Sequence, residues 1–179
     1  MAKTAKNNEH LILGEMIIEK ISIYLRKILF IMKEINLTTK IAVYSYTELT
    51  EEDKKLTTKA REATKTAYSP YSKFNVGVAL ELENGVVLTG SNQENAAFSS
   101  GTCAERSVIY YAGANYPGVA FKKLVIAAFT DGDFVEKPIS PCGHCRQAIL
   151  EYETIAQKPI EIILCGRNEV YKLESIKAL

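Results

Sequence analysis

The sequence lacks the features of a histidine-based metal protein, a disulfide scaffold or a nucleic-acid binder. It contains no tryptophan and only two histidines, His10 and His144, so histidine ligation of a metal has little support. Four cysteines in 179 residues are too few for the dense disulfide framework of a small secreted scaffold. The 22 basic and 21 acidic residues leave a net charge of +1, which predicts neither a nucleic-acid partner nor attachment to a membrane surface.

Long uninterrupted hydrophobic runs are also missing. Residues 11–32 are rich in isoleucine and leucine, but two glutamates, two lysines and an arginine interrupt them. This pattern argues against a membrane span, which needs about 20 largely apolar residues, and against a signal peptide. We expect residues 1–40 to be an N-terminal extension outside the core, with an amphipathic helix favoured over disorder and Met32 as an alternative start. Without a secretion signal, the chain is expected to be cytoplasmic.

The remaining sequence predicts one globular α/β domain. Apolar residues make up 47% of the chain and charged residues 24%, which is ordinary for a globular protein with one core. Acidic residues after Thr50 indicate a helix N-terminus, and Asn84-Gly85 is a strong hairpin signal. Helices and strands in this order predict a mixed sheet covered by helices. The predicted elements are a helix at 47–68, strands at 73–82, 86–88, 124–129 and 160–164, and helices that open at Cys103 and Cys142.

Three of the four cysteines have the spacing of metal ligands. Cys142 and Cys145 form a C-x-x-C pair, with Ser140 expected as the N-cap of their helix and Pro141 at its first helical position. Cys103 opens another predicted helix, so all three sulfurs are expected near helix N-termini, where the helix dipole favours thiolate. Three thiolates can hold Zn²⁺ at three corners of a tetrahedron and leave the fourth open to water.

Alternative roles for the cysteines stay open at this point. The C-x-x-C pair alone could be a redox dithiol, and Cys103 could then be a core residue. His144 directly precedes Cys145. It lies about 100° around the helix from that residue and is expected to point away from the sulfurs. Cys165 ends an apolar run and is interpreted as a small buried hydrophobic residue.

Charged residues beside the cysteines suggest catalytic and supporting roles. Glu105 lies two residues after Cys103, where its carboxylate could handle the protons of a water at the open metal position. Its alternative role is a capping box with Thr102. Arg106 lies three residues after Cys103 and Arg146 directly follows Cys145, and their guanidinium groups are expected to bond to sulfur and draw negative charge off the metal. The alternative is that both are ordinary surface arginines.

With these residues assembled, the chain resembles the cytidine deaminases, specifically the small homotetrameric type with a three-cysteine zinc site. Four motifs in order carry the resemblance, from about Tyr68 to Tyr152 and more faintly to the end of the chain. It implies a three-layer α/β/α fold with one mixed five-stranded sheet, and it makes residues 41–179 a single catalytic domain. The motifs are Ser-Pro-Tyr-Ser-Lys-Phe-x-Val-Gly at 69–77, Asn-x-Glu-Asn-Ala at 92–96, Cys-Ala-Glu-Arg at 103–106 and Pro-Cys-Gly-x-Cys-Arg-Gln at 141–147.

The resemblance implies a reaction and a role for each matched residue. Zinc would be held by the three cysteines, and Glu105 would move protons while water replaces the amino group of cytidine or deoxycytidine. Phe74 would pack against the base, Asn92 and Glu94 would bind the ribose hydroxyls, and Ala104 would be a further substrate-binding residue. The implied setting is pyrimidine salvage by a cytoplasmic homotetramer whose partner is a nucleoside, with no nucleic acid and no membrane.

Two departures from the family and three alternative functions accompany this interpretation. The chain stops at Leu179, without the aromatic tail that usually helps to close a neighbouring subunit's site, and the N-terminal extension is outside the family core. A deaminase of another cytosine compound, such as blasticidin S, is the nearest alternative. A non-catalytic zinc-binding module and a dithiol redox protein are the others, although an intact Glu105 and an open fourth ligand position argue for catalysis.

Overall fold

The computed structural model describes residues 17–26 and 34–179. Residues 17–26 are helical and all ten are exposed, whereas the rest of the amphipathic helix predicted over 11–32 lies outside the described residues, as does Met32. The stretch Thr39–Leu179 forms a compact unit of its own. Within the two described ranges, no helix has the length and apolar character needed to span a bilayer.

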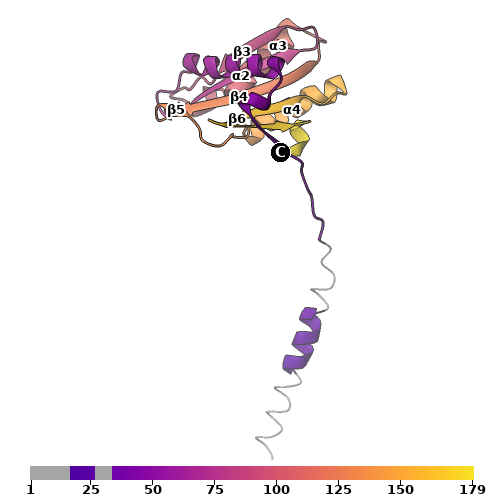
Figure 1. The fold of residues 1–179 in the computed structure, drawn as a ribbon. Helices are drawn as coiled ribbons and strands as arrows, with labels where there is room; N and C mark the ends of the chain where they lie inside the picture. The colour runs from indigo at the N-terminus through magenta and orange to yellow at the C-terminus, as the bar shows by residue number, and fades with distance from the viewer. Residues whose placement is uncertain (1–16, 27–33) are drawn as a thin grey trace, which may run out of the picture. The chain divides into compact units, whose positions relative to one another are not determined.

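A mixed sheet of seven strands forms the middle of the compact unit (Figure 1). The strand order is β1-β7-β6-β4-β2-β3, and β5 pairs with β4. β4 and β6 run parallel, while the other neighbouring pairs are antiparallel. The strands are β1 (Ala42–Ser45), β2 (Asn75–Leu82), β3 (Val87–Ser91), β4 (Phe121–Thr130), β5 (Asp133–Phe134), β6 (Glu161–Cys165) and β7 (Glu169–Leu173).

The prediction of five strands was too low by two. Sequence patterns located only four strands, which correspond to β2, β3, β4 and β6. The three strands without a predicted counterpart are β1, β5 and β7, of four, two and five residues. Each is short and lies only partly buried, so its sequence has no long apolar run to distinguish it from a loop. β1 exists because it pairs with β7, and β5 because it folds back on β4, which are tertiary contacts that local sequence does not reveal.

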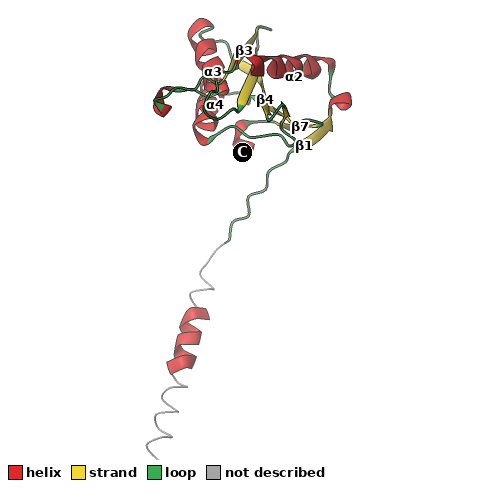
Figure 2. Ribbon diagram, turned by 90° about the vertical axis from the view of Figure 1, so that its left-hand side faces the viewer, coloured by secondary structure: helices red, strands yellow, loops and turns green. Residues whose placement is uncertain are grey.

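Helices cover both faces of the sheet, which confirms the three-layer α/β/α prediction (Figure 2). Neighbouring residues of β4 face opposite layers, because side chains alternate along a strand. Val125 packs in one core cluster with Leu56 of α2, and Leu124 packs in the other with Val108 of α3 and Ile149 of α4. The helices are α2 (Glu51–Ala63), α3 (Ala104–Asn115) and α4 (Gly143–Ala156), with short 3-10 turns η1 (Tyr46–Glu48), η2 (Thr64–Thr66), η3 (Phe98–Ser100) and η4 (Ile176–Ala178).

The predicted cap is confirmed, and the predicted hairpin forms at Asn84-Gly85, but its loop has three residues, 83–85, instead of the expected two. The Thr50 side chain accepts a hydrogen bond from the Asp53 N–H at the start of α2. Between β2 and β3, Gly85 adopts a φ of 83°, a left-handed conformation that glycine enters without steric cost. The Asn84 side chain accepts from the Val86 N–H in the same turn. Local sequence therefore determines these two connections.

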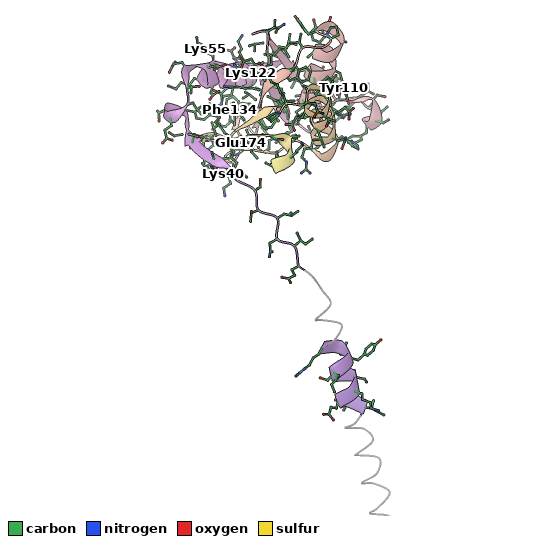
Figure 3. All side chains as sticks on the ribbon, turned by 90° about the vertical axis from the view of Figure 1, so that its right-hand side faces the viewer. Lys40, Lys55, Tyr110, Lys122, Phe134 and Glu174 are labelled. Carbon is green, nitrogen blue, oxygen red and sulfur yellow. The ribbon has the colours of Figure 1, made fainter. Side chains whose placement is uncertain are left out.

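Asp53 links α2 to the sheet through buried ion pairs. Its side chain is 1% exposed, and its two carboxylate oxygens lie 2.7 Å from Lys123 Nζ and 2.8 Å from Lys172 Nζ. Burial alone would raise the pKa of Asp53, but the hydrogen bonds from both lysines outweigh it and hold the pKa below its ordinary value. Nearby, Lys122, which Figure 3 labels, lies 2.6 Å from Glu52.

We predict that Asp53→Asn lowers the free energy of unfolding at pH 7 by about 2 kcal/mol, because hydrogen bonds to charged groups contribute about 1.5–3 kcal/mol. The depressed pKa means that the carboxylate stabilises the fold above the unfolded-state pKa of about 3.9 and loses this effect as pH falls below it. The difference between the two proteins in urea titrations should therefore be full at pH 7 and shrink progressively as pH falls below about 3.9. A constant difference across this range would contradict the assignment.

Candidate metal centre and active site

The topology brings two helix N-termini to one edge of the sheet. β4 and β6 are parallel, and α4 is the crossover between them, so α4 begins at the edge where β4 ends. α3 follows the β2–β3 hairpin and packs beside α4 on the same face. Cys103 is the N-cap residue of α3 and Cys142 is the N-cap residue of α4.

The helix start predicted around Ser140 was wrong by two residues. Cys142 occupies the capping position, so Ser140 and Pro141 precede α4 instead of forming its cap and first turn. Cys145 is the third residue of the helix, and its sulfur still shares the first turn with that of Cys142. The expectation that all three sulfurs lie at helix N-termini is confirmed.

The three predicted ligands form a cluster with the geometry of a zinc site. The Sγ atoms of Cys103 and Cys142 are 4.0 Å apart, and those of Cys142 and Cys145 are 3.5 Å apart. All three Sγ atoms lie within 4.8 Å of one another. Tetrahedral zinc with bonds of about 2.3 Å places its sulfur ligands about 3.8 Å apart. The sulfurs therefore fit zinc with little movement, and they exceed the length of any disulfide bond.

Without a metal, electrostatics at the cluster favour a thiolate at Cys103. The pKa of Cys103 is lowered to about 5, first because the Cys145 thiol donates a hydrogen bond to it and also because Arg106 lies beside it. The same hydrogen bond raises the pKa of Cys145, since that thiol must keep its proton to donate it. Arg106 Nη2 is 3.8 Å from the Cys103 sulfur, as the charge argument predicted. A divalent cation would replace the shared proton and hold all three sulfurs as thiolates.

Glu105 lies in the first turn of α3 and is only 5% exposed. Burial raises the pKa of its carboxyl group above the ordinary value, and the charge of Cys103 adds to the shift. The capping box with Thr102 does not form, because Cys103 is the N-cap and the Thr102 hydroxyl donates to the Cys103 carbonyl oxygen. A buried acid with a raised pKa beside a metal cluster is suited to accept and return protons.

Asn92 connects the two ends of the segment that carries Phe74. Its Oδ1 accepts from the Val76 N–H at 2.7 Å, and its Nδ2 donates to the Phe74 carbonyl oxygen at 2.9 Å. The amide keeps one acceptor lone pair and one N–H for a ligand. Asn92 therefore has a structural role that sequence analysis missed, and its predicted contact with ribose stays a prediction.

Glu94 holds the preceding loop in the same manner. Its Oε2 accepts from the backbone N–H groups of Tyr71 at 3.0 Å and Ser72 at 3.3 Å. A hydrogen bond with the Ser72 side chain lowers the pKa of Glu94 most, and the two backbone N–H groups lower it further, so the carboxylate is favoured. The second carboxylate oxygen makes no bond among the described residues, and the predicted contact of Glu94 with ribose stays a prediction.

The other predicted site residues are placed as follows. Ala104 is fully buried as the first residue of α3, directly between Cys103 and Glu105. Arg146 turns away from the cluster and donates to the Leu179 carbonyl oxygen, and no bond from it to sulfur is found within the described part of the chain. His144 is exposed, as predicted.

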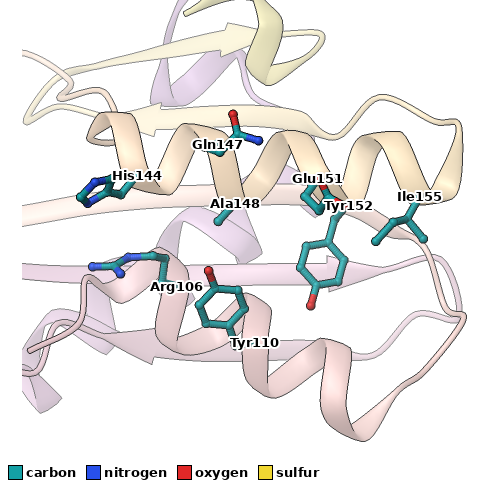
Figure 4. Close-up of a pocket in the computed structure, with 8 residues that line it drawn as sticks. All are labelled: Arg106, Tyr110, His144, Gln147, Ala148, Glu151, Tyr152 and Ile155. Carbon is teal, nitrogen blue, oxygen red and sulfur yellow. The ribbon is translucent and has the colours of Figure 1, made fainter. Parts of the chain in front are cut away.

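An open groove of about 590 Å³ runs between α3 and α4 and was not predicted (Figure 4). Arg106 and His144 lie at its end nearest the cysteines, and none of the three cysteines lines it. Its remaining lining residues occur at helical spacing on facing sides of the two helices, a pattern that a search for exposed aromatic residues could have found. Those residues are Tyr110, Gln147, Ala148, Glu151, Tyr152 and Ile155.

Three thiols with zinc geometry, a buried acid beside them and a three-layer α/β/α fold define the class of zinc-dependent deaminating hydrolases. A family profile described as "Cytidine and deoxycytidylate deaminase zinc-binding region" matches residues 50–159. The chain belongs to this family.

Named relatives and solved structures agree with this assignment. A cytidine deaminase of Sporosarcina psychrophila is 46% identical over 99 residues, which cover 55% of this chain and 68% of that protein. One of Mycobacterium tuberculosis is 38% identical over 93 residues, or 52% of this chain and 65% of that protein. The matched segment thus spans about two thirds of such relatives. The crystal structure of a Burkholderia pseudomallei cytidine deaminase superposes with a TM-score of 0.60 at 34% identity, covering 73% of this chain and 97% of the other.

We predict that Cys142→Ser lowers zinc content from about one ion per chain to well below half, because serine is a poor ligand for zinc. Metal analysis of the purified proteins measures this directly. Cys165→Ala is the matched control, since Cys165 is buried in β6 outside the cluster, and it should retain zinc. Equal zinc in the parent and in Cys142→Ser would refute the ligand assignment.

Proposed function

We propose that this chain is a zinc-dependent hydrolase that converts cytidine and deoxycytidine to uridine and deoxyuridine with release of ammonia. The observation that carries this proposal is the cluster of three sulfurs beside the buried Glu105 carboxyl group. Three protein ligands instead of four are typical of catalytic zinc sites, where one coordination position is left to water or substrate. A zinc-binding module without activity would have no use for a buried acid at that place.

The proton chemistry is assigned to Glu105. Zinc held by Cys103, Cys142 and Cys145 would act as a Lewis acid that lowers the pKa of water in the open position. Glu105 accepts a proton from the water that attacks C4 of the base and delivers it to N3. It then carries the second proton to the departing amino group, which leaves as ammonia. Burial raises the pKa of Glu105, which favours its acting as a proton carrier.

Arg106 adjusts the charge of this site. Three thiolates around a divalent cation leave a net charge of −1, which weakens the cation as a Lewis acid. The Arg106 guanidinium lies 3.8 Å from the Cys103 sulfur and withdraws negative charge from it. Arg146 takes no part in this charge adjustment; it donates to the Leu179 carbonyl oxygen and holds the C-terminal turn against α4.

The substrate is held by the segment before β2 and the turn after β3. Phe74 packs against the base, with its position set by the Asn92 side chain. Asn92 and Glu94 bind the ribose hydroxyls with the donor and acceptor atoms that the loop leaves free, and Ala104 lies beside the metal at the base. A site with such groups rejects compounds that lack the sugar, because its polar atoms would then be buried without partners.

Residues 41–179 constitute the catalytic domain, and residues 1–40 an extension from it. The active assembly is a homotetramer that acts in pyrimidine salvage in the cytoplasm. The groove between α3 and α4 supports subunit contacts, since Tyr110 and Ile155 are 53% and 68% exposed there. Large exposed apolar side chains on one groove favour association.

We expect the purified protein to release ammonia from cytidine and deoxycytidine, and a zinc chelator to abolish the release. A substrate panel of cytidine, deoxycytidine, free cytosine and blasticidin S separates the proposed function from the neighbouring one. Turnover of free cytosine should be at least about a hundredfold slower than that of cytidine, because unpaired polar groups cost several kcal/mol. Faster turnover of blasticidin S than of cytidine would favour the alternative deaminase, and no turnover of any compound would overturn the proposal.

Replacement of Glu105 by glutamine tests the proton-transfer role. Glu105→Gln keeps the side-chain shape but cannot carry a proton, so we expect kcat to fall by about 10³-fold or more while zinc content and fold stay unchanged. Steady-state kinetics and metal analysis on the same sample provide both readouts. Glu62→Gln, at an exposed position of α2 outside the groove, is the control with unchanged kcat. Parental turnover in Glu105→Gln would eliminate this residue as the proton carrier.

A further inference from the structure

Arg61, in the last turn of α2, is held in a cluster that the proposed mechanism does not use. Its guanidinium carbon lies 4.3 Å from the ring centroid of Tyr46 and 4.3 Å from that of Phe134, which Figure 3 labels. Two aromatic rings therefore stack on the planar group, an arrangement that suits arginine and not lysine. No ion pair within the described part of the chain involves Arg61. The two aromatic rings and its hydrogen bonds therefore hold the side chain in place.

The hydrogen bonds of Arg61 go to the turn between β6 and β7. Its Nη2 donates to the carbonyl oxygen of Gly166 at 2.7 Å and to that of Arg167 at 3.0 Å. The Tyr46 hydroxyl donates to the same Gly166 oxygen at 2.7 Å. Two elements that lie between β1 and β2 in the sequence, η1 and α2, thus hold a turn that comes more than 100 residues later.

The Gly166–Arg167 turn contacts residues 136–138, which precede the metal ligands Cys142 and Cys145. The Arg167 N–H donates to the Glu136 carbonyl oxygen at 3.3 Å. Gly166 also packs tightly against this segment. A Cβ atom added to Gly166 would lie 2.8 Å from the Glu136 carbonyl oxygen and 2.8 Å from Pro138 Cδ. Such distances leave no space for a side chain. The backbone of the turn therefore sets how close residues 136–138 lie to the sheet.

Only three residues, 139–141, separate this contact from Cys142. The near end of the segment is also fixed, because the Val135 N–H donates to the Ala128 carbonyl oxygen of β4. Because only three residues lie between Pro138 and Cys142, a shift of residues 136–138 should also move Cys142. Zinc tolerates ligand distances within only about 0.2 Å, so the position of Cys142 matters to metal binding.

We propose that Arg61 is a positioning residue for the metal centre, acting through the Gly166–Arg167 turn and residues 136–138 on Cys142 and Cys145. The role rests on the zinc site of the proposed function, but it adds a supporting layer from the opposite face of the sheet. Arg61 touches neither metal nor substrate, so its removal should be felt first in zinc affinity.

Arg61→Met tests the proposal, because methionine can still pack between the rings but donates no hydrogen bond. We expect its zinc affinity, measured by competition with a chromophoric chelator, to fall by about tenfold, the lower end of the range for residues that support metal ligands. The absorption spectrum of the Co²⁺-substituted protein should change, because it reports ligand geometry. Gly166→Ala should act in the same direction from the other side of the contact.

Lys59→Met is the matched control, since it removes the same charge from an exposed position of the same helix. It should leave zinc affinity and the Co²⁺ spectrum as in the parent. Arg61→Lys should also weaken zinc binding, because an ammonium group lacks the planar guanidinium that lies over the rings of Tyr46 and Phe134.

An Arg61→Met protein that loses thermal stability but keeps parental zinc affinity and Co²⁺ spectrum would overturn the proposal and leave a purely structural staple. If Arg61→Met does not fold, Gly166→Ala decides in the same way. A parent protein that binds no zinc or releases no ammonia would instead refute the proposed function, so the two failures are distinguishable.

Discussion

The meeting of two helix N-termini, at Cys103 and Cys142, is the constraint on which the site depends. Sulfur atoms this close repel one another once they are ionised, and the cluster is stable only where positive charge compensates them. Exposed N–H groups of α3 and α4, the guanidinium of Arg106 and finally a divalent cation supply that compensation. The same helix start buries Glu105 beside the sulfurs, so the metal site and the proposed proton carrier have one structural origin.

The sheet converts this local arrangement into a complete site. The parallel pair β4 and β6 requires a crossover helix, and that requirement places the start of α4 at the edge where β2 begins. Asn92 and Glu94, which follow β3, lie at the same edge. Each uses about half of its side-chain hydrogen-bonding groups to bind the backbone around Phe74. Residues that would recognise a substrate thus also order the segment that carries them. Loss of one of them would disturb both functions.

Prediction from the sequence succeeded where a short stretch of chain contains the whole signal. Thr50 before three acidic residues, Asn84-Gly85 in a hairpin and Cys142 with Cys145 on one helical turn are all local patterns. Prediction failed where pairing decides structure, as for β1, β5 and β7, and where the last residues before a helix can adopt either state, as at Ser140. The contact of Arg61 with Gly166 joins residues 105 positions apart, and no local pattern announces it.

The amino-acid sequence by itself determined the chemistry: which thiols and which carboxyl group this chain has, and their spacing at helix starts. The tertiary structure decided that three sulfurs from two distant motifs lie within 4.8 Å, that Arg106 faces them while Arg146 faces Leu179, and that a turn held from the far face of the sheet abuts the segment before Cys142. The physical reason is that helix and turn signals depend on neighbours along the chain. Distances between motifs depend on how the sheet pairs and which residues its two faces bury.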